Sequence, residues 1–197
     1  SVANNHSFDY TAEAFVDSLS KLNEAGISYV GGGFSREETH SPIIKEVRGT
    51  TIGFLAYTNL SSPLWQATDN AAGIAWVDLD TLDELKQDIQ KAKAQVDILA
   101  VSIHAGEEYQ KEPGDFQKTF AKTAIDAGAD LIIGHHSHVV QPLEQYKNAW
   151  IAYGLGNFVF DQYFSEETMQ GAILKVMMQD KQIKEATLLK TKLNPSY

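Results

Sequence analysis

Apolar residues along the chain occur in two patterns, short continuous runs and runs at helical spacing. Together these patterns are typical of a sheet covered by helices. Residues 98–103 and 131–133 form continuous apolar runs, which are typical of strands buried on both faces. Between them, residues 115–127 carry apolar side chains at helical spacing, and Gly128 ends the helix. A strand, a helix and a strand of these lengths form a βαβ unit, whose crossover is right-handed. The pattern therefore predicts an α/β fold.

The remaining elements follow from the same two periods. A helix is expected over residues 12–25, with Thr11 or Asp9 as its cap and Gly26 as its end. A second helix carries an apolar stripe from 82 to 92 and takes Asp80 as its cap. Short β-prone runs predict strands at 2–3, 27–30, 43–47, 52–57, 139–146, 150–153 and 158–160, and a closing hairpin of 173–178 and 183–189.

Two segments admit alternative interpretations. Three glycines at residues 31–33 indicate a turn or a close backbone approach. A phosphate cradle is disfavoured there because no lysine follows and no dinucleotide fingerprint is present. The polar loop 58–73, which contains Trp65, is either a simple surface loop or a substrate lid.

Composition narrows the class of protein. The 197 residues contain no internal repeat or linker, so we expect a single domain over 1–197 with a sizeable core. A formal net charge of −10 argues against a nucleic-acid partner. The absence of cysteine excludes disulfides and thiolate metal sites. No apolar run approaches the ~20 residues of a membrane span.

Half of the six histidines lie in one short segment that follows the buried strand 131–133. They are His135, His136 and His138, preceded by a glycine. Residues i and i+2 of an extended segment point the same way, so His136 and His138 are expected to converge while His135 faces elsewhere. Neutral imidazole is the commonest protein ligand of transition metals. A metal site is therefore favoured over a solvated loop that happens to contain histidines.

Other polar side chains also follow predicted strands, at the end where α/β sheets bind ligands. Taken singly, each fits a turn or a helix cap, whereas together they form a set of nitrogen and amide-oxygen ligands. Such a set suits Zn, Mn, Fe or a similar divalent ion. His40 falls outside the pattern and is interpreted as a surface residue. The residues expected at the common rim are Asn5, His6, His104, His136 and His138, with Asn157 as a further neighbour.

At these residues the chain resembles the poly-γ-glutamate capsule biosynthesis proteins of the CapA type, within the calcineurin-like metallophosphoesterase superfamily. The resemblance covers nearly the whole chain. It implies an αββα four-layer sandwich with a dinuclear metal site at the strand ends. The motifs that carry it are Asn4-Asn5-His6, His104-x-Gly106-x-Glu108-Tyr109, Gly134-His135-His136-x-His138 and Gly154-x-Gly156-Asn157-Phe158.

The resemblance also implies roles for individual residues. Asn5, His104 and His136 resemble ligands of the second metal, and His138 resembles a ligand of the first. His6 resembles the histidine beside the scissile phosphate, which acts as an acid or as a phosphate clamp. We group Glu108 and Tyr109 with the catalytic residues as typical site neighbours whose individual roles are not assigned. His135 either shapes the loop or replaces the usual glycine before the first ligand.

The sequence departs from the family pattern at its amino-terminal side. The family's Gly-Asp and Asn-Leu-Glu motifs, which would supply bridging carboxylates, are not found, and Gly114-Asp115 fits a helix N-cap better. Ala105 and Ser137 replace the usual tryptophan and proline. We therefore expect a domain that lacks its first strands, is inactive alone and holds divalent metal weakly or at one position. Self-association through an exposed sheet edge is a further expectation.

Two functions from different classes remain open. The first is a metal-dependent hydrolase of phosphate esters or a related bond, serving poly-γ-glutamate capsule synthesis or export. The alternative is a non-catalytic polymer-handling or scaffold domain of a membrane-bound capsule synthesis complex. In either case the expected partners are an anionic polymer or phosphoester and the synthesis or export complex. The expected location is the extracellular face of the cell membrane, with an upstream segment as the anchor.

Overall fold

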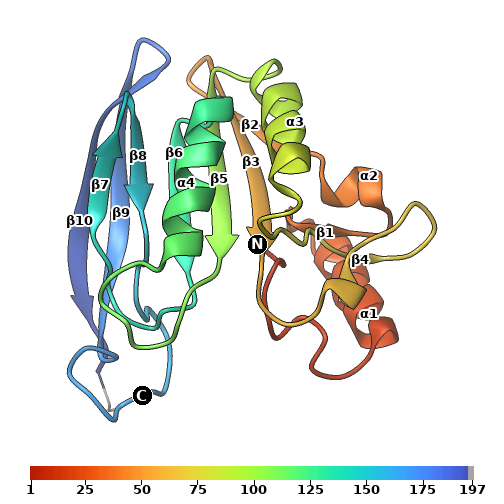
Figure 1. Cartoon of the computed structure of the whole chain (residues 1–197), viewed down its shortest axis with the longest axis horizontal. Helices are drawn as coiled ribbons and strands as arrows, with labels where there is room; N and C mark the ends of the chain where they lie inside the picture. The colour runs from red at the N-terminus through yellow and green to blue at the C-terminus, as the bar shows by residue number, and fades with distance from the viewer. Residues whose placement is uncertain (195–197) are drawn as a thin grey trace.

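A six-stranded sheet forms the centre of the computed structural model, which describes residues 1–194 (Figure 1). Its strands are β2 (Ile43–Val47), β3 (Thr50–Thr58), β5 (Ile98–His104), β6 (Leu131–His135), β7 (Leu143–Tyr146) and β8 (Ala149–Ala152). The strand order is β2-β3-β5-β6-β8-β7. The four inner strands run parallel, and the two edge strands pair antiparallel with their neighbours. The carboxyl ends of the four inner strands therefore share one rim.

Two helices, α3 (Leu82–Lys93) and α4 (Asp115–Ala127), lie over one face of this sheet (Figure 1). Alternate residues of β5, such as Leu99 and Val101, belong to the same buried cluster as Phe120 of α4. Phe120 is fully buried, so its replacement by alanine is expected to cost about 3–5 kcal/mol. The predicted βαβ unit of β5, α4 and β6 is confirmed, as is the end of α4 at Gly128.

A smaller unit stands beside this sheet on its β2 side (Figure 1). It contains α1 (Ala12–Glu24), α2 (Arg36–Thr39), the two-stranded pair of β1 (Gly32–Gly33) and β4 (Gly73–Ile74), and the 3-10 turn η1 (Pro63–Trp65). Phe8 stacks on Phe15 and on Trp65, with ring centroids 4.6 and 4.8 Å apart. Because Trp65 closes this small core, the structure favours a packing role for the loop 58–73 over that of a substrate lid.

The closing hairpin is confirmed as β9 (Gln170–Gln179) and β10 (Gln182–Lys192), which flank the β7–β8 side of the central sheet (Figure 1). Lys181 at its tip forms an ion pair of 3.0 Å with Asp97, just before β5. Helices α3 and α4, the central sheet and this hairpin confirm a mixed α/β fold with a central sheet. Within residues 1–194, no helix has the length and apolar character needed to cross a membrane.

Three short strands that the sequence predicts do not form within the described residues. Residues 2–3 and 27–30 are joined by the hydrogen bond from Val2 N to Val30 O (2.9 Å), and so short a pairing makes no ladder. Residues 158–160 instead lie in an exposed loop. The strand expected over 139–146 begins only at Leu143.

The start of α3 differs from its prediction as well. Thr81 is the N-cap residue in place of Asp80, and its side chain makes no capping hydrogen bond to the first N–H groups of the helix. The Oδ1 atom of Asp78 accepts hydrogen bonds from the backbone N–H groups of Asp80 (2.9 Å) and Thr81 (3.0 Å). Asp78 thus stabilises the turn before the helix, and the predicted cap lies one residue from the observed N-cap.

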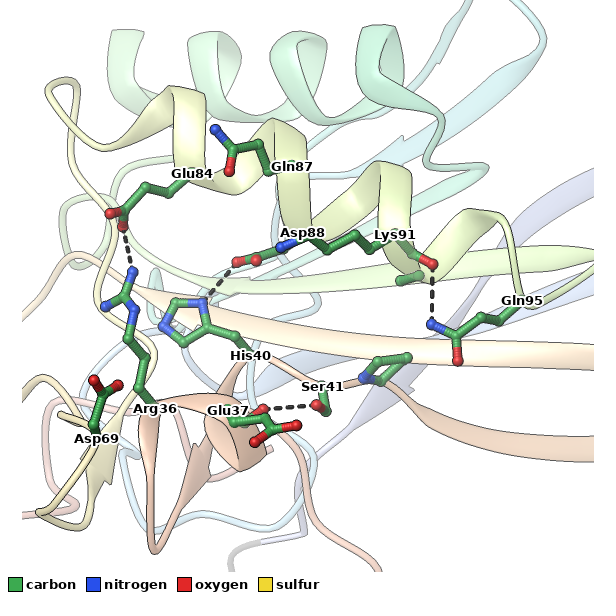
Figure 2. Close-up of a pocket in the computed structure, with 12 residues that line it drawn as sticks. Arg36, Glu37, His40, Ser41, Asp69, Glu84, Gln87, Asp88, Lys91 and Gln95 are labelled. Carbon is green, nitrogen blue, oxygen red and sulfur yellow. Dashed lines mark hydrogen bonds and ion pairs between the residues drawn. The ribbon is translucent and has the colours of Figure 1, made fainter.

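His40 is buried, and its interpretation as a surface residue is wrong. The side chain is 10% exposed, and its Nδ1 lies 2.7 Å from Oδ2 of Asp88 in α3 (Figure 2). The hydroxyl of Tyr57 donates to the same oxygen at 3.1 Å. Beside this group, Arg36 and Glu84 form an ion pair of 2.8 Å (Figure 2). His40 thus ties the end of α2 to α3.

Candidate metal centre

Four predicted ligands meet at the carboxyl end of the parallel strands. His104 is the last residue of β5, and His136 and His138 lie in the loop after β6. Asn5 comes from a turn before α1, and its Oδ1 is 2.9 Å from Nε2 of His104. Ring centroids of His104 and His136 are 5.0 Å apart, and those of His136 and His138 are 5.9 Å apart. The residues lie together as expected, although Asn5 follows no strand.

His136 and His138 converge through left-handed backbone. The prediction that an extended segment brings them together is therefore wrong. The φ angles are +94° at His136 and +57° at His138, a region that costs a residue with a Cβ about 1–3 kcal/mol. Buried Ser137 stabilises the turn between them, because its Oγ donates to the carbonyl of Val139 (2.8 Å). Its own carbonyl accepts from the N–H of Tyr109 at 2.7 Å, which brings the loop after β5 alongside.

Glu108 completes a group of three side chains with metal-binding atoms. One ligand atom each from Glu108, His136 and His138 lie within 4.8 Å of one another. Oε1 of Glu108 is 4.0 Å from Nε2 of His138. From the sequence, Glu108 is expected among the catalytic residues, with no defined role. Its position beside His136 and His138 would allow its carboxylate to join them as a metal ligand.

Asn157, expected on the same rim, fixes the orientation of His138. Its Oδ1 accepts a hydrogen bond from Nδ1 of His138 at 2.9 Å, so Nε2 carries the free lone pair and faces Glu108. Asn157 is itself buried, and its Nδ2 donates to the carbonyl of Thr168 (2.9 Å) and to Oε1 of Gln162 (3.2 Å). Gln162 and Thr168 were not predicted, because nothing in their local sequence links them to a histidine 24 or more positions earlier.

His6 lies at the exposed side of the cluster, linked to it by a short chain of hydrogen bonds. All its contacts are satisfied when Nε2 of His104 donates to Asn5 and Nδ2 of Asn5 donates to Nε2 of His6 (3.3 Å). Nδ1 of His6 then donates to Oδ2 of Asp9 at 2.9 Å. In this arrangement His6 presents an acceptor toward the site, and it becomes a proton donor only after Nε2 gains a proton.

Tyr109, the third residue counted as catalytic, lies over His138 with ring centroids 6.1 Å apart. Its hydroxyl accepts a hydrogen bond from Nε2 of Gln162 at 3.2 Å. A hydrogen bond to Glu108 raises the pKa of the Tyr109 hydroxyl, so this group stays protonated at neutral pH. Tyr109 can therefore donate a hydrogen bond but is poorly suited to act as a base.

Burial keeps the inner histidines neutral. Desolvation, aided by the charge that His136 can carry, lowers the pKa of His104 to about 3. Burial also lowers the pKa of His136, and it lowers the pKa of His135 to about 4. A histidine binds a metal ion through an unprotonated nitrogen, so these side chains are ready to act as ligands without first losing a proton.

The donor set and its spacing fit a divalent ion. Ligand atoms about 2.1 Å from one ion are separated by about 3–4 Å, depending on the angle between them. The separation of 4.0 Å between Oε1 of Glu108 and Nε2 of His138 lies in this range. Imidazole nitrogen with carboxylate and amide oxygen suits Zn, Mn or Fe. The residues present therefore fit such an ion.

Solved structures with a similar fold include two nucleotidases. The chain superposes on a Staphylococcus aureus protein assigned as a 5′-nucleotidase with a TM-score of 0.61 and 17% identity, covering 98% of this chain and 38% of that one. For the NAD nucleotidase of Haemophilus influenzae the TM-score is 0.53 and the identity 13%, with coverage of 96% and 38%. At such identities the likeness concerns the fold, which is of the 5′-nucleotidase and metallophosphoesterase type.

Sequence relatives are more closely similar. The chain is 38% identical over 161 residues to the PGA biosynthesis protein CapA of Bacillus subtilis, which covers 81% of this chain and 42% of the relative. It is 37% identical over 183 residues to the capsule biosynthesis protein CapA of Bacillus anthracis, with coverage of 91% and 44%. The chain thus spans less than half the length of these relatives. Residues 1–162 match the family of bacterial capsule synthesis proteins described as PGA_cap, and the chain belongs to that family.

Proposed function

We propose that this chain carries part of the metal centre of a phosphoesterase-type hydrolase that acts in the synthesis or export of a poly-γ-glutamate capsule. The observation that carries the proposal is the convergence of Glu108, His136 and His138, with ligand atoms within 4.8 Å. Around them, buried Asn157 and the pair of Asn5 and His104 supply the orientation and further ligands that metal sites need.

The contacts suggest a role for each residue of the proposed centre. A bound divalent ion supplies charge neutralisation at the attacked group and activates water at neutral pH. His138, Glu108 and His136 would hold such an ion, and His136 also lies beside His104, which is bonded to Asn5. His6 is oriented by Asp9 and remains open to solvent, so it is positioned to clamp the substrate anion or, once protonated, to donate to the leaving group.

The setting of the reaction is also a proposal. Capsule and polyglutamate biosynthesis are named for the Bacillus relatives, and they suggest an anionic polymer or a phosphoester as substrate and a synthesis complex as partner. We place the protein at the outer face of the cell membrane, where a capsule is assembled. Cell fractionation with surface proteolysis tests this location directly.

The test uses two proteins, because this chain covers only 42% of the Bacillus subtilis relative. One is the chain alone. The other is a chimaera in which it replaces the matching 161 residues of that relative. Each is assayed with Mn²⁺ or Zn²⁺ on bis(p-nitrophenyl) phosphate. We expect turnover by the chimaera and none by the chain alone, since the family resemblance implies bridging carboxylates and the group of Glu108, His136 and His138 contains only one carboxylate.

Variants separate catalysis from simple metal binding. His136→Ala in the chimaera should abolish turnover, whereas His40→Leu, which changes the buried contact to Asp88, should leave the turnover per folded molecule unchanged. A folded chimaera that binds metal but hydrolyses no phosphoester would instead support the non-catalytic, polymer-handling alternative. Equal rates for the wild-type chimaera and His136→Ala would contradict the proposed centre.

A further inference from the structure

The loop after Asn157 exposes an unusual amount of apolar surface. Phe158 is 62% exposed, Val159 85%, Phe160 44% and Phe164 67%. Scattered exposed apolar side chains are ordinary, but a contiguous group of this kind marks a binding surface. Packing against the core does not account for these side chains.

Two aromatic rings lie beside His138 of the candidate metal centre, and a third packs against one of them. Phe160 lies 5.1 Å from the ring of His138, and Tyr109 lies 6.1 Å from the same ring. Phe164 packs edge-on against Tyr109 with centroids 5.2 Å apart. We call Tyr109, Phe160 and Phe164 the ring wall. A molecule that reaches His138 from solvent comes within contact distance of it.

The base of the loop is held in place, although its apolar tip is exposed. The buried hydroxyl of Thr168 donates to the carbonyl of Gln162 at 2.8 Å, and Gln162 bridges Asn157 and the Tyr109 hydroxyl. Tyr109 has a φ of +64°, which an aromatic residue adopts only under constraint. The ring wall is therefore positioned before any ligand arrives, and such preorganisation favours recognition.

We propose that the ring wall binds a planar, aromatic group of the substrate while the anionic group of the same molecule occupies the metal centre. This inference rests on the proposed function and narrows its substrate class to anionic esters that carry an aryl or base-like group. Aromatic faces and edges attract planar π-systems beyond simple burial. A polymer of glutamate carries no such group, so the wall indicates a small-molecule substrate.

Charge on the same loop argues against a membrane surface as the occupant. Asp161 and Glu166 are exposed close to the rings in sequence, Glu167 is paired with Lys111 at 2.8 Å, and the whole chain has a net charge of −10. A lipid surface that attracts proteins electrostatically is anionic, and it would repel this segment. A small planar ligand meets no such penalty once a cation occupies the centre.

The test measures binding, so it does not depend on turnover. The Zn²⁺-loaded chain is titrated with phenylphosphonate and with methylphosphonate, which share the anion and differ in the ring. We expect phenylphosphonate to bind about tenfold more tightly, as one stacked ring typically gives. Phe160→Ala and Phe160→Leu should both remove most of this preference and leave the methylphosphonate affinity unchanged. Val159→Ala, at the most exposed position of the loop, is the control and should retain the preference.

Each outcome has a definite meaning. Equal affinities of the two phosphonates, or a preference that survives Phe160→Ala, would overturn the ring wall as a recognition element while leaving the proposed function intact. A preference retained by Phe160→Leu would show generic apolar contact and contradict recognition of a planar group. Binding of neither phosphonate by the metal-loaded chain would overturn this inference, whereas the proposed function stands or falls separately on turnover by the chimaera. Binding of the chain to vesicles of anionic phospholipid that is tighter than its binding to phenylphosphonate, and that is lost in Phe160→Ala, would show that the ring wall binds a lipid surface. That result would contradict recognition of a planar ligand.

Discussion

Nδ1 of His138 donates a hydrogen bond of 2.9 Å to Oδ1 of Asn157, which lies 19 residues further along the chain. The bond selects the tautomer in which Nε2 of His138 has a free lone pair, and it aims that atom toward Glu108. Asn157 is buried and is bonded in turn to the carbonyl of Thr168. The loop after β8 thus determines how a histidine of the loop after β6 can bind a ligand.

Asn157→Ala removes this orientation without touching a ligand atom. We expect the affinity for Zn²⁺ or Mn²⁺ to fall about tenfold to a hundredfold, the usual effect of losing a hydrogen bond behind a metal-binding histidine. Asn157→Asp keeps the acceptor for Nδ1 and should retain more of the affinity. Isothermal titration of the three proteins gives the comparison, and unchanged affinity in Asn157→Ala would show that His138 needs no such support.

Acid should begin to destabilise the fold at about pH 6.5, well above the pKa of ordinary carboxyl groups. Burial lowers the pKa of His104 to about 3 and that of His135 to about 4, whereas an unfolded histidine has a pKa of about 6.5. Between these values the unfolded chain binds more protons, so stability is present above pH 6.5 and is lost as the pH falls toward 4. Urea unfolding of the chelator-treated protein between pH 7.5 and 4.5 tests this. His135→Gln should flatten the dependence, and a midpoint independent of pH would contradict it.

Gly134 allows β6 to pass close to the backbone beyond β8. A Cβ at this position would overlap the carbonyl oxygen of Tyr153. Because that obstacle is backbone, Gly134→Ala should cost at least about 3 kcal/mol and displace the loop that carries His136. Gly114→Ala is the matched control, since its Cβ would meet an atom only at 3.8 Å and should cost about 1 kcal/mol or less. Chemical denaturation measures both, and equal costs would contradict the close approach.

His40 and the rim histidines should respond differently to substitution. His40→Leu leaves the carboxylate of Asp88 with the hydroxyl of Tyr57 and without its imidazole partner, so a loss of about 1–3 kcal/mol is expected. Metal binding should not change. Thermal unfolding of His40→Leu measures the loss of stability, and a metal titration of the same variant measures its metal affinity. Loss of metal binding in this variant would show that His40 contributes to the metal centre and would contradict the prediction.

The spacing of apolar residues predicts much of the fold, because it reflects which side of each strand or helix is buried. The runs at 98–103 and 131–133 are buried strands, and the helix over 115–127 has its predicted bounds. The strand expected at 158–160 failed because apolar side chains there face solvent beside His138, which local sequence cannot distinguish from burial. His40 was missed because its partner Asp88 is 48 residues away.

The sequence predicts which residues lie together at the site. It does not predict the backbone geometry that brings them together. Strand ends and the family resemblance brought together Asn5, His104, His136 and His138 before any geometry was known. The left-handed backbone at His136 and His138 could not be predicted, because glycine, the residue that usually marks this conformation, is absent from both positions. The position of Glu108 depends on the strained backbone of its neighbour, so its place among the ligand atoms emerges only in three dimensions.

The most direct test of the proposed centre is a titration of the metal-free chain with Zn²⁺ or Mn²⁺, combined with elemental analysis after desalting. We predict one saturable site per chain, weakened at least tenfold by His136→Ala and by Glu108→Gln and unchanged in His40→Leu. No saturable binding, two tightly bound ions per chain, or equal affinity in His136→Ala would contradict the assignment of the metal centre to Glu108, His136 and His138.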